Sequence, residues 1–213
     1  DLAFALTNSN SSRPAEHRSI ALAINVMDLA SMVESPDSSK RYNTENVVWF
    51  FCNIVTAAKN EFASIELFTS GAEKDLIAAT EVKNRVYSKI GIDLHIFHPK
   101  TLDELLAFLA NVREVIGSRM HAGILAYVSG CNTLCINWDD KVQGVWSTVG
   151  QSERVIQMHE IIRDDAVEII TKKFKKLSPE SVDGLDAISK EVRRGVLESI
   201  GKEVVYSKKY GPL

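Results

Sequence analysis

The sequence VIGSRMHAGILAYVSG, residues 115–130, carries the clearest signal of the fold. An apolar run of strand length leads up to Gly117 and Ser118, and an apolar pattern of helical length follows as far as Gly130. A buried strand that turns through a glycine directly into a buried helix is typical of the parallel sheets of α/β proteins. The stretch therefore predicts one strand–helix unit of such a sheet.

The same alternation of strands and helices continues on both sides of this unit. It predicts a Rossmann-like, doubly wound parallel sheet, because right-handed crossovers place the intervening helices on both of its faces. Gly91 follows the helical pattern of residues 73–90 and is expected as its left-handed C-cap. The expected strands are residues 19–26, 64–70, 92–97, 113–118, 132–138 and 153–158, and the expected helices are residues 44–61, 73–90, 101–112, 120–130, 140–150 and 164–177, with a last helix beginning at Ser178.

These patterns divide the chain into three predicted regions. Residues 1–18 form an N-terminal extension or linker, because TNSNSSRPAEHR is polar and rich in turn-forming residues. Residues 19–163 form the Rossmann-like domain, and residues 164–213 form C-terminal helices that pack on it. The first residue is not Met, which leaves open that the sequence is a piece of a longer protein.

The composition argues against several classes of function. The 25 Lys and Arg against 28 Asp and Glu give a net charge of −3, so nothing favours nucleic acid as a partner. No apolar run approaches the about 18 residues of a membrane span. Cys52, Cys131 and Cys135 lack C-x-x-C spacing, which argues against a disulfide framework or a zinc site, and no metal is expected. We therefore expect a cytoplasmic protein without a membrane span, and a homo-oligomer is left open.

Basic side chains follow two neighbouring strands of the predicted sheet. Arg119 offers a bidentate fork for a carboxylate or phosphate, and His121 can donate a proton near neutral pH. Gly117 and Ser118 let the backbone approach a ligand at the start of the helix. Lys141 follows the next strand, whose end lies only about 5 Å away in such a sheet. The pattern predicts an anion site; alternatively, Arg119 pairs with a surface carboxylate and His121 only caps the helix.

The block VIGSRMHAGILAYVSGCNTLCINWDDKVQGVWSTVG, residues 115–150, resembles the polysaccharide pyruvyl transferase family. The resemblance lies in an apolar strand, Arg-x-His-Ala, a helix that ends at a glycine, a second apolar strand and a lysine before a further helix. IALAINV, residues 20–26, fits the first strand of the same half of the family's fold, and DLAFAL, residues 1–6, fits the segment before it. Three positions depart from the family pattern, namely Asn132, Trp138 and Asp140, and Asp140 lowers the positive potential beside Lys141.

The resemblance implies the C-terminal, donor-binding half of a GT-B-like fold with two Rossmann-like domains. The family moves the pyruvyl group of phosphoenolpyruvate onto two hydroxyls of a sugar as a ketal, with a saccharide or lipid-linked saccharide of a surface polysaccharide as acceptor. No cofactor is needed beyond this substrate. Carried over, Arg119 and Lys141 clamp the phosphate and carboxylate, and His121 binds phosphoenolpyruvate and acts as general acid. The acceptor-binding half is not in this sequence, so the chain is expected to hold half of an active site.

Other residues at the same predicted edge are weaker candidates. His98 is a weaker candidate for lining the crevice than Arg119, His121 and Lys141, and His95 is weaker still. Ser70 and Gly71 supply backbone donors or only cap a helix. Asn25 and Asp28 follow the first strand and are similarly weak candidates for lining the crevice.

Two other functions are left open. One is a nucleotide-sugar glycosyltransferase of GT-B type, which usually has a glutamate in the helix of residues 122–130, where this chain has no acidic residue. The other is a non-catalytic binding domain that keeps the fold.

Overall fold

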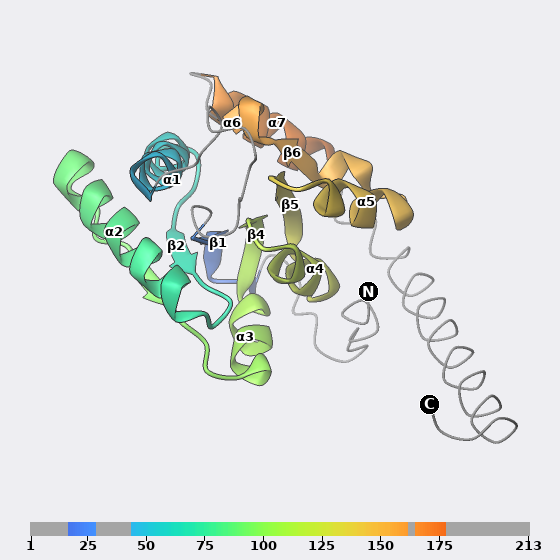
Figure 1. Cartoon of the computed structure of the whole chain (residues 1–213), viewed down its shortest axis with the longest axis horizontal. Coiled ribbons are helices and arrows are strands. Elements are labelled where there is room, and N and C mark those ends of the chain that lie inside the picture. The colour runs from blue at the N-terminus through green and yellow to red at the C-terminus, as the bar shows by residue number, and fades with distance from the viewer. Residues whose placement is uncertain (1–16, 29–43, 162–164, 178–213) are drawn as a thin grey trace, which may run out of the picture.

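A computed structural model describes residues 17–28, 44–161 and 165–177, and these form an all-parallel sheet flanked by helices (Figure 1). The strand order is β3-β2-β1-β4-β5-β6, which confirms the expected doubly wound α/β fold. The strands are β1 Ile20–Asn25, β2 Ile65–Phe68, β3 His95–Phe97, β4 Val112–Gly117, β5 Asn132–Asn137 and β6 Val155–Gln157.

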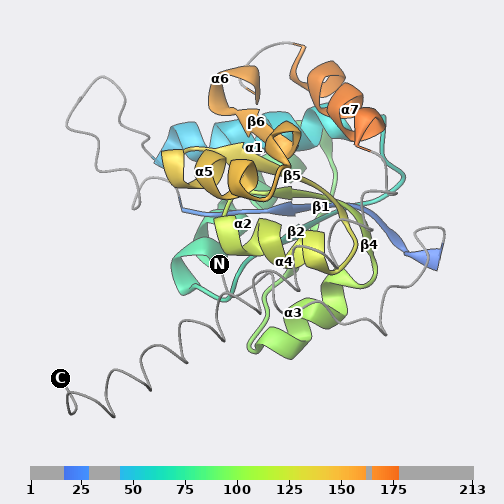
Figure 2. The same cartoon turned by 90° about the vertical axis from the view of Figure 1, so that its right-hand side faces the viewer.

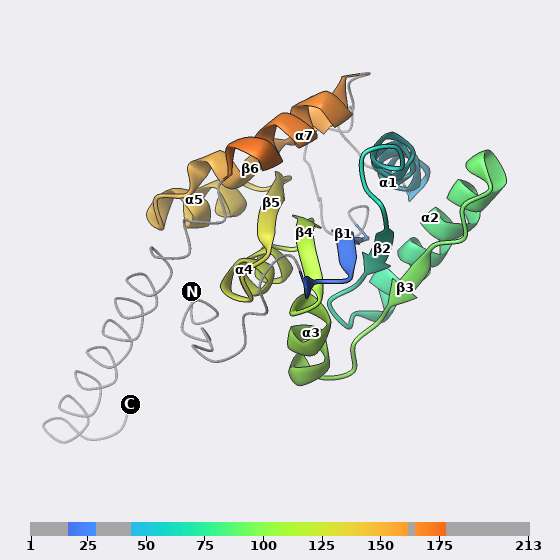
Figure 3. The same ribbon diagram turned by 180° about the vertical axis from the view of Figure 1, so that it is seen from behind.

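Helices cover both faces of the sheet (Figures 2 and 3). Buried side chains of the central strands, among them Ile24 and Ile116, pack against α1, α2 and α7 on one face. Val115 packs with α3 and α4 on the other face, and α5 packs beside α4. The helices are α1 Thr44–Ala58, α2 Glu73–Ile90, α3 Leu102–Leu109, α4 Met120–Val128, α5 Asp140–Thr148, α6 Met158–Ile161 and α7 Ala166–Lys176, and a 3₁₀ turn occupies Ser152–Arg154.

Most element boundaries follow the sequence pattern closely. α2 occupies the predicted residues 73–90 and ends at Gly91, which has φ 72° and donates its N–H to the carbonyl of Tyr87. The predicted helix of residues 164–177 is present as α7, which contacts α1 and β5. The predicted helix after Ser178, and the predicted linker up to residue 16, lie outside the described residues. No helix in the described part of the chain is long and apolar enough to cross a membrane.

The strand order creates a switch point between β1 and β4. The chain builds outward from β1 through β2 to β3, then returns through α3 to pair β4 with the opposite side of β1, with Ile24 beside Ile116. The helices that follow β1 and β4 therefore lie on opposite faces, and the connections leave a crevice at the carboxyl ends of these strands. Asn25 ends β1 and Gly117 ends β4 at this crevice.

The start of α3 is fixed by a reciprocal cap. The hydroxyl of Thr101 accepts the N–H of Glu104 at 3.2 Å, and the carboxylate of Glu104 accepts the N–H of Lys100 at 2.6 Å. Both bonds satisfy backbone donors that would otherwise lack a partner at a helix start. The connection from β3 to α3 is thereby held in one shape.

The first turns of α4 lie unusually close to the sheet. A Cβ added at Gly123 would stand 2.1 Å from the Sγ of Cys135 on β5, and a Cβ added at Gly117 would stand 3.0 Å from the Cα of Gly123. Two glycines at the contact therefore allow a helix to touch a strand almost backbone to backbone. This contact sets the position of the start of α4 at the crevice.

Replacing Gly123 by alanine is expected to lower the free energy of unfolding by about 1–3 kcal/mol, because the added methyl group overpacks this contact. In Gly123→Ala/Cys135→Ala, the nearest atoms would be the Cβ of residue 135 at 3.8 Å and Cζ2 of Trp146 at 3.7 Å, so part of the stability should return. Urea unfolding measures both values. Gly144→Ala, on α5 where a Cβ meets nothing, is the control and should be neutral or stabilising by up to about 1 kcal/mol. A Gly123→Ala protein as stable as the wild type would contradict this packing.

β4 carries a partly buried carboxyl group, that of Glu114. Burial raises the pKa of Glu114 to about 7, against the lowering effects of Arg113 and of a hydrogen bond with Asn132. The amide of Asn132 also donates to the carbonyl of Phe174 on α7 at 3.1 Å. Glu114 therefore sits where a charge is poorly solvated.

The free energy of unfolding should fall as the pH rises from about 4.5 to about 7. The folded state holds the Glu114 proton more tightly than the unfolded chain over this range, so raising the pH favours unfolding. Glu114→Gln should reduce this pH-dependent loss in the free energy of unfolding by about 1–3 kcal/mol. The variant should therefore be more stable than the wild type at pH 8. Chemical unfolding at several pH values measures this pH dependence. Glu153→Gln, at an exposed glutamate, is the control. A wild-type slope unchanged in Glu114→Gln would overturn the assignment.

Candidate functional site

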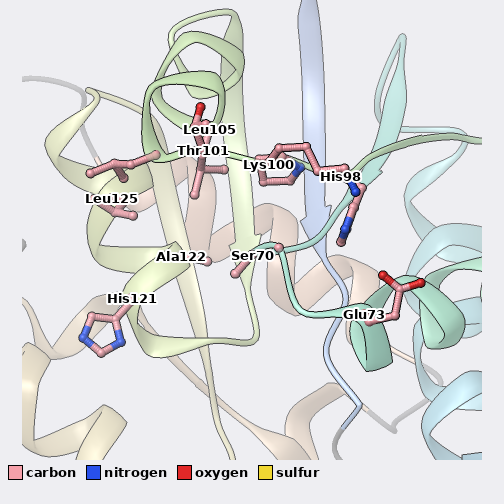
Figure 4. Close-up of a pocket in the computed structure, with 12 residues that line it drawn as sticks. Ser70, Glu73, His98, Lys100, Thr101, Leu105, His121, Ala122 and Leu125 are labelled. Carbon is pink, nitrogen blue, oxygen red and sulfur yellow. The ribbon is translucent and has the colours of Figure 1, made fainter.

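A cavity of about 490 Å³ opens at the carboxyl edge of the sheet, beside the switch point (Figure 4). The connection after β2, the connection after β3 and the first turns of α4 form its wall, which places it on the α3 and α4 side of the sheet. Its lining residues are Ser70, Gly71, Glu73, His98, Pro99, Lys100, Thr101, Leu102, Leu105, His121, Ala122 and Leu125. Its volume is within the range of roughly 300–1,000 Å³ that is typical of ligand pockets.

His121 lies at one end of this cavity. It is the second residue of α4 and is exposed, and Figure 4 shows its ring pointing away from His98 and Lys100. The side chain of the N-cap residue, Arg119, makes no capping hydrogen bond, and the first turn of α4 contains no acidic residue. No carboxylate in the first turn of α4 therefore offsets the partial positive charge at the start of this helix.

His98 and Lys100 lie at the other end, where the chain leaves β3. The Nδ1 of His98 is 2.6 Å from the hydroxyl of Thr69, which is fully buried. Lys100 is exposed, and Glu73 at the start of α2 lines the same end (Figure 4). His95 is three residues earlier, pairs with Glu66 at 3.0 Å and does not line the cavity.

Arg119 is paired with a buried carboxylate. Its Nε donates to Asp75 Oδ2 at 2.5 Å and its Nη2 donates to Oδ1 at 2.9 Å, while the side chain of Asp75 is 0% exposed. The backbone N–H of Asp28 adds a third bond to Asp75 at 3.0 Å. Arg119 does not line the cavity, and its Nη1 makes no hydrogen bond within the described residues. Arg119 therefore has a carboxylate partner, as the alternative expected, but this partner is buried and not at the surface.

The connection between β4 and α4 is held from both neighbouring strands. The side-chain oxygen of Asn25 accepts the backbone N–H of Arg119 at 2.9 Å, and the hydroxyl of Ser118 donates to the carbonyl of Asn25 at 2.6 Å. On the other side, the indole of Trp138 donates to the carbonyl of Ser118 at 2.6 Å. Asn25 and Trp138 thus fix this connection and do not themselves line the cavity.

Lys141 lies at the exposed start of α5. Its backbone N–H donates to the side chain of Asp139, which caps the helix, at 2.8 Å. Its side chain does not line the cavity. The structure thus brings His121 into the cavity with His98, Ser70 and Gly71, and it leaves Lys141 and Arg119 outside the cavity wall.

Sequence reasoning did not find Asp75, although the pattern contained a signal. Asp75 shares one buried face of α2 with Ala78, Ala79, Val82 and Val86, at the spacing that otherwise marks an apolar stripe. A carboxylate on such a face needs a buried partner. Within the described residues, no group of three or more His, Cys, Asp or Glu side chains is placed to hold a metal ion.

The structure is that of a Rossmann-like α/β domain with a cavity at the carboxyl edge of its sheet. The family model for polysaccharide pyruvyl transferase matches residues 1–140, more than half of the chain, and the chain belongs to this family. Arg119 and His121 lie within the matched residues, and Lys141 lies one position beyond them. A search of curated proteins found no match.

Arg119→Ala is expected to lower the free energy of unfolding by about 3–5 kcal/mol, because it leaves the buried carboxylate of Asp75 without its charged partner. Arg119→Ala/Asp75→Ala should recover part of this loss, and urea unfolding of the set gives the coupling energy. The exposed pair Lys83–Asp93, 2.9 Å apart, is the control, and Lys83→Ala should cost no more than about 1 kcal/mol. Additive losses in the Arg119 and Asp75 variants would contradict the pairing.

Proposed function

We propose that this chain binds phosphoenolpyruvate in the cavity and takes part in moving its pyruvyl group onto two hydroxyls of a sugar. The supporting observation is that His121, a residue within the family match, lines a cavity at the carboxyl edge of the sheet. Ligands of doubly wound sheets bind at this edge, close to the switch point. The cavity is larger than a three-carbon phosphate fills, so it leaves room for the acceptor hydroxyls.

The proposed reaction needs one proton donor and several hydrogen-bond donors. A proton adds to the methylene carbon, one sugar hydroxyl bonds to the carbon that carries the phosphate, and the second hydroxyl displaces the phosphate at that carbon. The two hydroxyl protons balance the proton on the methyl group and the proton carried away by inorganic phosphate. His121 is the proposed general acid, since an imidazole exchanges protons near neutral pH.

The proposed roles of Arg119 and Lys141 differ because their surroundings differ. The Asp75 carboxylate compensates the charge of Arg119, so Arg119 would offer the N–H groups of Nη1 and little net charge. Lys141 is exposed on a flexible stem and would bring an uncompensated charge to the phosphate or carboxylate. Hydrogen-bond donors and positive charge at these positions would stabilise the charge that grows on a leaving phosphate.

The wider setting of the reaction is part of the same proposal. The acceptor would be a saccharide or lipid-linked saccharide on the route to a surface polysaccharide, and this chain would be the donor-binding half of a GT-B-like enzyme. Cys52, Cys131 and Cys135 are free and buried, and burial raises the pKa of Cys131 and Cys135 to about 12. Such thiols support a reducing, cytoplasmic location.

Calorimetric titration of the 213-residue chain with phosphoenolpyruvate tests the proposal. Saturable binding is expected, and His121→Ala should weaken it about tenfold or more, the cost of a hydrogen bond to a charged group. Lys141→Ala should weaken it less, because Lys141 lies outside the cavity wall and contributes a charge on a flexible stem. His159→Ala and Lys175→Ala are matched controls, since both residues are exposed and lie on α6 and α7, away from the cavity wall.

A parallel titration with a UDP-sugar separates the competing function. Binding of the UDP-sugar without binding of phosphoenolpyruvate would overturn the proposal in favour of a glycosyltransferase. Binding of neither would favour a non-catalytic domain. Binding of phosphoenolpyruvate that survives both His121→Ala and Lys141→Ala would place the substrate elsewhere on the chain.

A further inference from the structure

The imidazole of His98 is held by a hydrogen bond that fixes its orientation. Its Nδ1 lies 2.6 Å from the hydroxyl of Thr69, and that hydroxyl also accepts the backbone N–H of Gly71 at 3.4 Å. Thr69 is 0% exposed and follows directly after β2, so the hydroxyl is fixed by the sheet itself. The ring of His98 therefore has a rigid partner on its Nδ1 side.

This arrangement determines what the other ring nitrogen can do. A threonine hydroxyl has one proton, and within the described residues its neighbours are the N–H of Gly71, which it accepts, and the Nδ1 of His98. The proton of Thr69 is thus directed at Nδ1, which leaves the ring proton of neutral His98 on Nε2. In the imidazolium form Nε2 carries a proton as well. Nε2 is a hydrogen-bond donor in both forms, and it has no partner among the described residues.

We propose that His98 is a second substrate-binding imidazole, whose Nε2–H donates to an anionic oxygen of the substrate at the end of the cavity opposite His121. Thr69 is the positioning residue that aims this N–H. The inference rests on the proposed function, and it names a site residue that the family pattern around Arg119 and Lys141 does not contain. Lys100 lines the same end and adds a positive charge.

The cavity has a histidine in its wall at each end. His121 lies at one end and His98 with Lys100 at the other, with Ser70 and Ala122 between them (Figure 4). Phosphoenolpyruvate carries its phosphate and its carboxylate on the same carbon atom. Together these groups offer several anionic oxygens, more than one imidazole can contact, so a second imidazole has an acceptor available.

Titration of the full chain with phosphoenolpyruvate, using variants at this end of the cavity, tests the inference. His98→Ala should weaken binding about ten- to a hundredfold, the cost of a hydrogen bond to a charged group. His98→Gln should recover part of the affinity, because its amide can donate from near the position of Nε2. His95→Ala is the matched control, an exposed imidazole of β3 outside the cavity, and should bind as the wild type does. Glu73→Gln should tighten binding, since it removes a carboxylate from the same end.

The role of Thr69 is tested with a measurement that a purely structural role would leave unchanged. Thr69→Val keeps the shape of the side chain and removes the hydroxyl, whereas Thr69→Ser keeps the hydroxyl. The ¹⁵N shifts of His98 should report one tautomer, protonated on Nε2, in the wild type and in Thr69→Ser, and a mixture in Thr69→Val. Adding phosphoenolpyruvate should move the Nε2 shift in the wild type.

The outcomes separate this inference from the function on which it rests. If the wild type binds phosphoenolpyruvate and His121→Ala weakens it while His98→Ala does not, the role of His98 is wrong and the proposed function stands. If the wild type does not bind phosphoenolpyruvate, both fall. Thermal unfolding will show whether His98→Ala folds. If it does not, the ¹⁵N shift of His98 Nε2 in the wild type decides, and a shift that phosphoenolpyruvate leaves unchanged overturns the inference.

Discussion

The carboxyl edge of this sheet depends on one buried ion pair, between Asp75 and Arg119. Asp75 opens α2 after β2, Arg119 precedes α4 after β4, and the N–H of Asp28 after β1 joins them. Three connections that diverge at the switch point are therefore held together by one carboxylate. Removing two charges from water is costly, and bidentate geometry with a third hydrogen bond is the arrangement that offsets this cost. The cavity beside the pair keeps its shape because these connections cannot move independently.

The same pair changes how the electrostatics of the site should be understood. A cation at a helix start looks like a ligand for an anion, but Asp75 compensates the charge of Arg119. The basic residues that line the cavity are His98, His121 and Lys100. The buried pair therefore fixes the geometry of the connections, and the cavity wall is lined by other, less buried basic residues.

Most of the fold was predictable from the sequence because it depends on local patterns. Apolar runs, helical periodicity and the glycine at position 91 predicted α2 to the residue, and the Gly117–His121 stretch was correctly placed at a strand end. The partner of Arg119 was not predicted, because Asp75 is 44 residues away and their contact depends on the strand order. For the same reason the sequence gives little indication of a role for His98. Its spacing from His95 does not indicate where its ring lies, whereas in the structure the pairing of β2 with β3 brings Thr69 next to it.

The two ends of the cavity are unequal, and this inequality bears on how an anion would be held at each of them. The first turn of α4, beside His121, has no acidic residue, whereas α2 and α3 begin with Glu73 and with Asp103 and Glu104. Carboxylates in a first turn offset the partial positive charge of the helix start, so α4 keeps more of it. An anionic group of the proposed substrate would therefore be favoured more by the helix start at the His121 end. At the His98 end Glu73 works against an anion, so binding there would depend on the directed N–H of His98 and on the charge of Lys100.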